Sequence, residues 1–211
     1  SFKNNVLSVK NLLQFAFKKQ KTKLIFASSA AVYGKVSGEK VSENKSLHPA
    51  NHYGISKYVC EQIINEHFRN KKNHYAILRY FNVVGSIINF KIKKKINSLF
   101  DIIGNNIKKN KHKININGSK LDTKDGTPER DFIHILDLCR IHVKVYEHLR
   151  KNRKTILNCG SGQKYSVLQI VKTFEKLKNK KFKISYKVVN PDETQTICSD
   201  NKNLKKVLKI E

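Results

Sequence analysis

Two side chains, Tyr53 and Lys57, have the types and the spacing for proton transfer to a substrate hydroxyl. Four positions apart on a helix expected over 52–70, they lie on one helical face. An ammonium group nearby favours the phenolate form of tyrosine, and a phenolate can take a hydroxyl proton while a hydride leaves the same carbon. The pair alone is weak evidence, because a chain with 8 tyrosines and 37 lysines in 211 residues is expected to contain about one such pair by chance. By itself it is better explained as a half-buried tyrosine beside a solvated lysine.

The elements around this pair follow the pattern of an α/β protein. Apolar periodicity predicts a helix over 6–17, a short buried strand over 24–27, the helix over 52–70 and a second buried strand over 75–83. Ligands of parallel sheets bind beyond the carboxyl ends of the strands. Ser29 and Asn82 lie at the carboxyl ends of the two strands and are therefore candidate site residues.

The second half of the chain predicts further alternation of helices and strands. The expected elements are a basic helix over 92–107, a strand over 113–117, a loop over 118–130, a mostly helical segment over 132–149, a strand over 155–159, a helix over 167–177 with Ser166 as its N-cap, and a last strand over 183–188.

Four segments of the chain carry distinctive motifs. They are Ser28-Ser29-Ala30-Ala31-Val32-Tyr33-Gly34, Arg79-Tyr80-Phe81-Asn82-Val83-Val84-Gly85, Asp125 to Leu138, and Asn158-Cys159-Gly160-Ser161-Gly162. With these segments, the sequence resembles the UDP-glucose 4-epimerase family of the extended short-chain dehydrogenases/reductases. The similarity covers nearly the whole chain in the family's order, and its most specific part is the block over 125–138.

The resemblance implies both a fold and a reaction. The fold is α/β, an incomplete Rossmann-type parallel sheet whose first strands are missing, with a smaller α/β substrate-binding domain. Residues 1–85 and 132–160 would belong to the NAD-binding domain, and residues 86–131 and 161–211 to the sugar-nucleotide-binding domain. The reaction is the interconversion of UDP-glucose and UDP-galactose through a transient 4-keto sugar with bound NAD.

The resemblance also assigns roles to individual residues. Tyr53 would be the acid/base, Lys57 would tune it and hold the nicotinamide ribose, and Ser29 would orient the sugar 4-hydroxyl. The other implied contacts are Asn5 and Phe81 with the cofactor, Asn82, Asn97, Ser98, Leu99 and Asn117 with the UDP part, Arg130 with the diphosphate, and Glu193 with the substrate in place of a family Asp. No metal site is expected.

The sequence departs from the family pattern in several places. Its nine glycines never form the GxxGxxG or GxGxxG turn that holds a dinucleotide pyrophosphate, and the family's tail after Leu208 is missing. Asn190 stands in place of a second diphosphate arginine, and Asn97 precedes a Ser where a second Asn is usual. We expect residues 24–27 to form an uncovered sheet edge, and this 211-residue piece expressed alone to be inactive and poorly soluble.

Some neighbouring polar residues have simpler structural interpretations. Asp131 and Asp137 are expected to be caps or ion-pair partners, and His134 a satisfied core histidine. Residues 160–162 are expected to form a tight turn rather than a phosphate cradle, because one Gly pair is a weak signal.

The bulk composition narrows the alternatives. The net charge of +27 comes mainly from lysines spread along the whole chain, which favours a solvated surface over a nucleic-acid face. Four cysteines without CxxC spacing indicate a reducing compartment, and with neither a signal peptide nor a long apolar stretch we expect a soluble cytoplasmic protein. A homodimer without nucleic-acid or membrane partners is expected. One alternative is another NAD-dependent sugar-nucleotide epimerase or a dehydratase, and Ala30 and Ala31 argue against the dehydratase. A basic nucleic-acid-binding protein is a further alternative with less support.

Overall fold

The computed structural model describes residues 2–16, 22–36, 40–70, 73–86, 98–152, 154–189 and 194–210. Its helices are α1 (Phe2–Ala16), η1 (a 3-10 helix, Ala30–Tyr33), α2 (His52–His67), α3 (Leu99–Lys108), α4 (Ile135–His148), α5 (Val167–Lys178) and α6 (Lys202–Leu208). Its strands are β1 (Lys23–Ser29), β2 (Lys40–Val41), β3 (His74–Tyr80), β4 (Asn82–Val84), β5 (Lys113–Asn117), β6 (Glu129–His134), β7 (Lys154–Cys159), β8 (Lys164–Ser166), β9 (Lys183–Lys187) and β10 (Thr196–Ser199).

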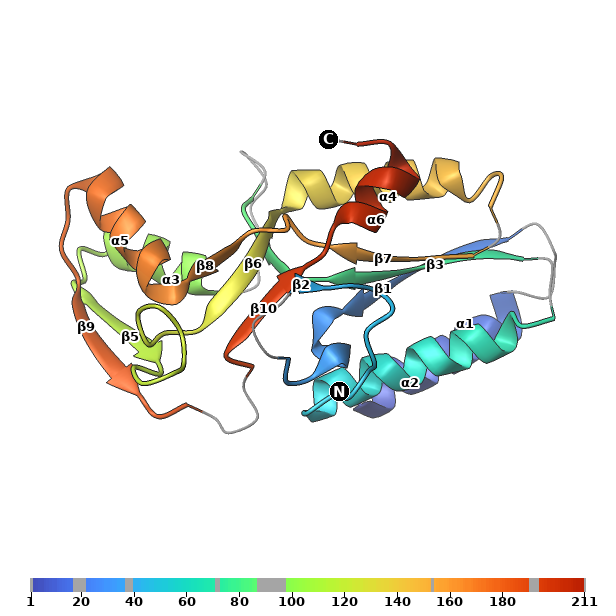
Figure 1. Cartoon of the computed structure of the whole chain (residues 1–211), viewed down its shortest axis with the longest axis horizontal. Helices are drawn as coiled ribbons and strands as arrows, with labels where there is room; N and C mark the ends of the chain where they lie inside the picture. Colours follow the sequence, from blue (N-terminus) through green and yellow to red (C-terminus); the bar gives the residue numbers. More distant parts are fainter. Residues whose placement is uncertain are drawn as a thin grey trace.

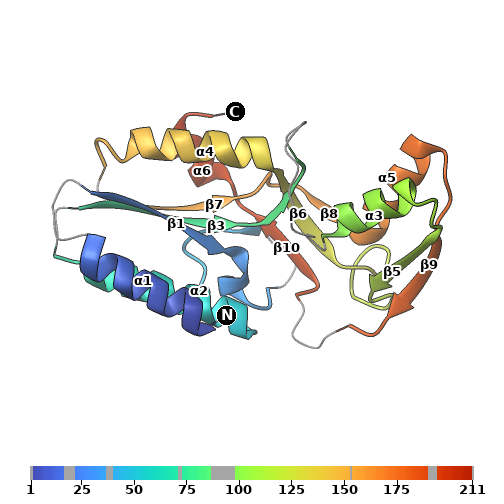
Figure 2. The same ribbon diagram turned by 180° about the vertical axis from the view of Figure 1, so that it is seen from behind.

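The larger part of the molecule is built on a three-stranded parallel sheet in the order β1-β3-β7. Helices α1 and α2 cover one face of this sheet, and α4 and α6 cover the other (Figures 1 and 2). Ile64 and Ile77 are fully buried on the first side, and Val145 and Leu157 on the second. Apolar burial on both faces is what a parallel sheet requires, so the expected α/β class is confirmed.

The register places the carboxyl ends of the three strands side by side. Ser29 pairs with Tyr80, which in turn pairs with Cys159. Among the described strands, β1 pairs only with β3 and therefore forms the edge, as the sequence predicted for residues 24–27. Ala27 on this edge strand is exposed.

A second sheet lies across the carboxyl ends of the first. Its strands run in the order β2-β10-β6-β4, and β8 pairs with β6 in the antiparallel direction. Because β4 begins two residues after β3 ends, the chain passes directly from one sheet into the other. Figure 1 shows β6, β8 and β10 extending from the larger part toward the smaller one.

The smaller part consists of the parallel pair β5-β9 with helices α3 and α5. Its core contains Ile103, Ile114, Ile116 and Val171, each buried almost completely. Helix α5 begins with a capping box in which Ser166 and Gln169 bond each other's backbone amides, so the predicted cap at Ser166 is confirmed.

Two secondary-structure expectations differ from the structure, and a third falls only partly within the described residues. Residues 129–134 form strand β6, whereas a loop and then a helix were expected, because the segment is paired by β4, β8 and β10. Strand β9 is not the last element, since β10 and α6 follow it. The basic helix expected over 92–107 lies partly outside the described residues, and its described part is α3.

The division into two domains stays a proposal. Helix α6 was expected in the smaller domain, within residues 161–211, but it lies elsewhere. Helix α6 packs on the larger part, where Leu204 and Leu208 share a core with Leu138 and Val145 of α4. Within the described residues no helix is long and apolar enough to cross a membrane.

Candidate active site

The candidate site begins where β1 ends, at Ser29. Its backbone is extended (φ −146°, ψ 148°), and its Oγ accepts a hydrogen bond of 3.2 Å from the amide of Ala31. Ser29 is thus the N-cap of η1, the turn that leads the chain away from the sheet. A hydroxyl in this position lies at the carboxyl edge of the sheet, where ligands of such folds bind.

Helix α2 starts against the same turn. Asn51 caps it by accepting a hydrogen bond of 2.8 Å from the amide of Gly54. A Cβ atom added at Gly54 would lie 2.5 Å from the carbonyl oxygen of Ala31, so only glycine permits this approach of α2 to η1. This contact brings the first turn of α2, which carries Tyr53, to the turn that follows Ser29.

Lys57 secures the helix one turn further along. Its Nζ donates a hydrogen bond of 2.9 Å to the carbonyl oxygen of Ala27 in β1. The same ammonium lies 5.1 Å from the centre of the Phe26 ring and 5.9 Å from the centre of the Tyr53 ring. Burial lowers the pKa of Lys57 from its ordinary value. Tyr53 keeps 47% of its surface exposed, so its phenol is open to a ligand.

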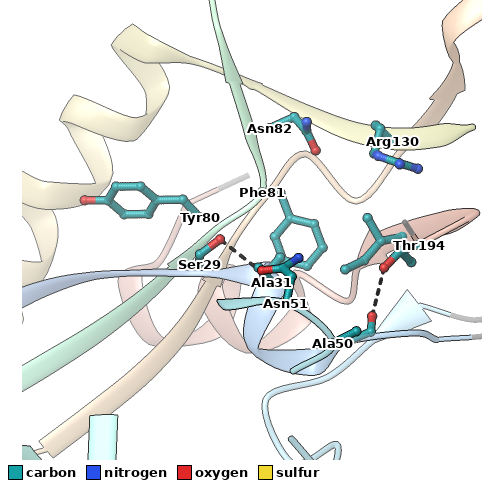
Figure 3. Close-up of a pocket in the computed structure, with 12 residues that line it drawn as sticks. Ser29, Ala31, Ala50, Asn51, Tyr80, Phe81, Asn82, Arg130 and Thr194 are labelled. Atoms are coloured by element: carbon teal, nitrogen blue, oxygen red, sulfur yellow. Dashed lines mark hydrogen bonds between the residues drawn. The ribbon is translucent and has the colours of Figure 1, made fainter. Parts of the chain in front are cut away.

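A pocket of about 270 Å³ lies beside this end of β1. It brings together four residues that the sequence selected, Ser29, Phe81, Asn82 and Arg130 (Figure 3). Asn82 comes from β4, and Arg130 from β6, so the pocket lies where the two sheets meet. Nη1 of Arg130 donates to the carbonyl oxygens of Glu129 and Gln195, at 2.9 and 3.0 Å.

Other lining residues were not selected from the sequence. They are Ala30, Ala31, Gly34, Ala50, Asn51, Tyr80, Thr194 and Ile197. The cap at Asn51 could have been found, because an Asn directly before a helix is a known start signal. Thr194, whose Oγ1 donates to the carbonyl oxygen of Gly34 at 3.0 Å, lies 160 positions from its partner, and no local pattern predicts that contact.

The remaining predicted site residues lie elsewhere. Nδ2 of Asn5 in α1 donates to Oγ of Ser56 at 3.0 Å, and this hydroxyl in turn donates to the carbonyl oxygen of Tyr53. Ser98 caps α3, and Leu99 packs against the core of the smaller part. Asn117 is exposed at the end of β5. Asn97 and Glu193 lie outside the described residues.

Asp131 has a structural role, as the sequence suggested. It is completely buried, and its carboxylate accepts hydrogen bonds from Ser161, Gly162 and Ser199. The amides at 161 and 162 are therefore occupied by a carboxylate of the protein, which supports the expectation of a tight turn over 160–162. Asp137 forms a surface ion pair with Arg140 at 2.8 Å.

The expectation for His134 is wrong. Its side chain is exposed instead of lying in the core, and its Nδ1 accepts a hydrogen bond from the amide of Leu136. It is the N-cap of α4, at the point where β6 turns into the helix. His134 was expected within a block that passes from strand to helix, and it lies at that junction, where its ring caps the helix instead of packing in the core.

Comparison with known proteins agrees with this geometry. Residues 1–160 match the family described as NAD dependent epimerase/dehydratase. The chain belongs to this family. The matched range includes Ser29, Tyr53, Lys57 and Arg130, and it extends from α1 to the end of β7.

Individual members of the NAD dependent epimerase/dehydratase family are similar over almost the whole chain. A UDP-glucose 4-epimerase of Rhizobium meliloti is 29% identical over 212 residues, which cover 98% of the chain and 64% of that protein. The crystal structure of a UDP-glucose 4-epimerase from Bifidobacterium longum in complex with NAD+ and UDP has a TM-score of 0.90 and 30% identity, covering 100% of the chain and 64% of its own. A UDP-Glc/GlcNAc 4-epimerase from Campylobacter jejuni has a TM-score of 0.78 and 29% identity, covering 98% and 64%. The chain spans 56 to 64% of the length of the first curated relatives it matches.

Proposed function

We propose that the complete protein interconverts UDP-glucose and UDP-galactose with NAD as its cofactor. The observation that carries the proposal is the attachment of α2 to the end of β1, where Lys57 donates to Ala27, two positions before Ser29. Tyr53 lies on the same face of α2 as Lys57, one helical turn earlier. The relatives named UDP-glucose 4-epimerase support this choice of substrate.

The residues at this edge fit the nicotinamide half of NAD. An ammonium carries three N–H donors, so Lys57, which gives one to Ala27, keeps donors for the hydroxyls of a ribose. The phenol of Tyr53 and the hydroxyl of Ser29 supply further polar partners, and Phe81 and Asn5 are the proposed neighbours of the cofactor. The 211 residues contain no glycine-rich turn for the pyrophosphate half.

In the proposed mechanism Tyr53 takes the proton of the sugar 4-hydroxyl. Ser29 orients that hydroxyl by hydrogen bonding, and the charge of Lys57 favours the phenolate that accepts the proton. NAD, when bound, would supply the hydride acceptor and donor for C4, and Lys57, Tyr53 and Ser29 are the residues that would hold its nicotinamide end beside the sugar. Tyr53 then gives the proton back, so it acts as base and acid in turn.

The pocket supports substrate binding by its polar side chains. Asn82 would contact the UDP part, and Arg130 would bind the diphosphate, for which a planar guanidinium is suited. We propose contacts of the UDP part also for Asn97, Ser98, Leu99 and Asn117, and a substrate contact for Glu193. A UDP-N-acetylhexosamine is the second candidate substrate, favoured by the similarity to the Campylobacter protein.

A dehydratase is less well supported than an epimerase. The described residues that line the pocket include no carboxylate, and the two positions after Ser29 are Ala30 and Ala31. None of these described lining residues is a carboxylic acid that could protonate a leaving hydroxyl.

We propose a homodimer through α1 and α2 and a location in the cytoplasm. Figure 2 shows α1 and α2 together on one side of the molecule. Leu7, Leu12 and Phe15 of α1 and Ile55 of α2 are exposed to 37% or more, and large exposed apolar groups are typical of interfaces. All four cysteines are free thiols, which supports a reducing compartment. Light scattering of the complete protein tests the dimer.

The test of the function is incubation of the complete protein with UDP-glucose, UDP-galactose and UDP-GlcNAc, followed by chromatography of the products. We expect epimers of the hexoses, and we expect Tyr53→Phe to lower kcat by about 10²–10⁴-fold because the acid/base is lost. UDP affinity should change little. Near wild-type turnover by the variant, or no epimer from any of the three substrates, would contradict the proposal.

A further inference from the structure

A buried polar cluster lies directly behind the candidate site. Its members come from β1, η1, α2, β3 and β7, and each is exposed by 3% or less: Ser28, Tyr33, Glu61, Arg79 and Asn158. Four of the five lie within a few positions, along the chain, of a residue of the proposed site. The proposed chemistry uses none of them.

The first half of the cluster joins β1 to α2. Oγ of Ser28 donates to Oε1 of Glu61 at 2.5 Å. Ser28 is the neighbour of Ser29, and Glu61 follows Lys57 by one helical turn, on the same side of α2. Together with the bond from Lys57 to Ala27, this contact ties α2 to the last residues of β1 at two successive points.

The second half of the cluster holds the far end of η1. Arg79 makes an ion pair of 2.7 Å with Glu61 and donates from Nη1 to the Tyr33 hydroxyl at 2.9 Å. That hydroxyl donates to Oδ1 of Asn158 at 2.7 Å. Helix η1 spans Ala30–Tyr33, so Ser28 lies two positions before its first residue and Tyr33 is its last. The chain on both sides of this turn is therefore anchored to one guanidinium–carboxylate pair.

The energetics favour a role beyond stability. A buried ion pair loses the hydration of both charges, and apolar residues of similar volume often stabilise a fold equally well. Here every buried side-chain N or O atom of the described residues has a hydrogen-bond partner, and a fully satisfied network defines one geometry. The geometry it defines is that of β1, η1 and α2, the three elements that carry Ser29, Tyr53 and Lys57.

We propose that Ser28, Glu61 and Arg79 are positioning residues that set the distance between the Ser29 hydroxyl and the Tyr53–Lys57 pair. This inference rests on the proposed function for its catalytic consequence. Loss of the Ser28 contact would let α2 shift against β1 without removing any group that touches the substrate.

The decisive variant is Ser28→Ala in the complete protein, since it removes the β1–α2 contact and leaves the ion pair intact. The matched control is Thr155→Val, which removes a hydroxyl that is 8% exposed at the opposite end of the same sheet. Four quantities are measured for each: kcat, the KM for the UDP-sugar, the unfolding temperature, and hydrogen–deuterium exchange of the peptide over 28–36.

We expect Ser28→Ala to lower kcat by about ten-fold with little change in KM, because small misplacements of catalytic groups act mainly on the chemical step. Exchange over 28–36 should become faster than in Thr155→Val at a similar unfolding temperature. The proposal is overturned if the two variants have equal kcat or equal exchange over this peptide.

A second pair of variants separates positioning from stability. Glu61→Leu/Arg79→Met replaces the ion pair by apolar groups and should be more stable than Glu61→Leu alone, which leaves Arg79 buried without its partner. The double variant should still show the lowered kcat, and recovery of wild-type kcat would overturn the proposal. If wild-type protein converts no UDP-sugar, the proposed function fails, while the exchange comparison still decides the positioning role.

Discussion

The ammonium of Lys57 donates a hydrogen bond to the backbone carbonyl oxygen of Ala27, at 2.9 Å. A residue of α2 is thereby attached to the carboxyl end of the edge strand β1, two positions before Ser29. Lys57 thus contributes to the site in two ways, since it holds α2 in place and presents positive charge near the Tyr53 ring, 5.9 Å from its centre.

Lys57→Met tests whether the charge and the hydrogen-bond donor of Lys57 matter, and not only the size of its side chain. Methionine has a flexible apolar side chain of similar length, but it lacks the ammonium that lies over the Phe26 ring and donates to Ala27. We expect kcat to fall by about 10²-fold or more, because the phenolate of the acid/base loses its support, with little loss of stability for a half-exposed side chain. Steady-state kinetics and thermal unfolding of the complete protein measure both. Lys144→Met on α4 serves as a control, and equal kinetics of the two variants would exclude a catalytic role for Lys57.

Gly54→Ala tests the close approach of α2 to η1. The new Cβ would lie 2.5 Å from the carbonyl oxygen of Ala31, so the helix must move away, at about 1–3 kcal/mol in the free energy of unfolding. Turnover should fall as Tyr53 moves with the helix. Urea unfolding and kcat measure the two effects.

Gly104→Ala is the control for this substitution. No heavy atom lies within 4 Å of a Cβ built at Gly104 in α3, and alanine favours a helix over glycine by about 0.5–1 kcal/mol. This variant should therefore be slightly more stable, with unchanged kcat. A stable and active Gly54→Ala protein would show that the spacing between α2 and η1 is not critical.

Arg130→Lys tests the proposed diphosphate contact. Lysine keeps the charge but cannot make two parallel hydrogen bonds to a phosphate, so we expect KM for the UDP-sugar to rise by about ten-fold. Its backbone contacts to Glu129 and Gln195 would also be weakened. Arg140→Lys, in a surface pair with Asp137, should leave KM unchanged. Inhibition by UDP gives an independent measure, and wild-type inhibition would argue against the assignment.

Acid stability should depend on Asp125. Burial alone would raise the pKa of Asp125, but hydrogen bonds from Ser166 and Thr127 outweigh it and lower the pKa below the ordinary carboxyl value. A pKa depressed in the folded state gives stability that is present above the unfolded pKa, about 4, and lost as the pH falls through the folded value. Wild-type protein should thus lose stability below about pH 4.

Asp125→Asn should have a lower unfolding temperature than wild type at pH 7. Its unfolding temperature should fall less steeply below about pH 4, so the difference from wild type narrows as the pH falls. Thermal unfolding between pH 7 and pH 3 follows both. Asp122→Asn removes an exposed carboxylate from the same loop and controls for net charge. Parallel curves for wild type and Asp125→Asn would refute the linkage.

Several features of this protein depend on local sequence alone. Apolar periodicity determined α1, α2, β1, β3, β5, β7 and α5, because each buries a continuous stripe or run that is visible in the sequence. The N-caps at Asn51 and Ser166 likewise need only their own helix. Ser29 and Asn82 could be selected because they lie at the ends of such strands, whereas Arg130 was selected from the family resemblance.

The tertiary structure alone decided which of these residues meet. Strand β6 exists because β4, β8 and β10 pair with it, and such partners, up to 67 positions away, leave no local signal. The same holds for Thr194 at the pocket and for α6 on the core of the larger part. The bond from Ser28 to Glu61 spans 33 positions, and no local pattern distinguishes Glu61 from a solvated helix residue. Buried polar networks satisfy their hydrogen bonds across elements, so their membership follows from packing and not from the residues of any one segment.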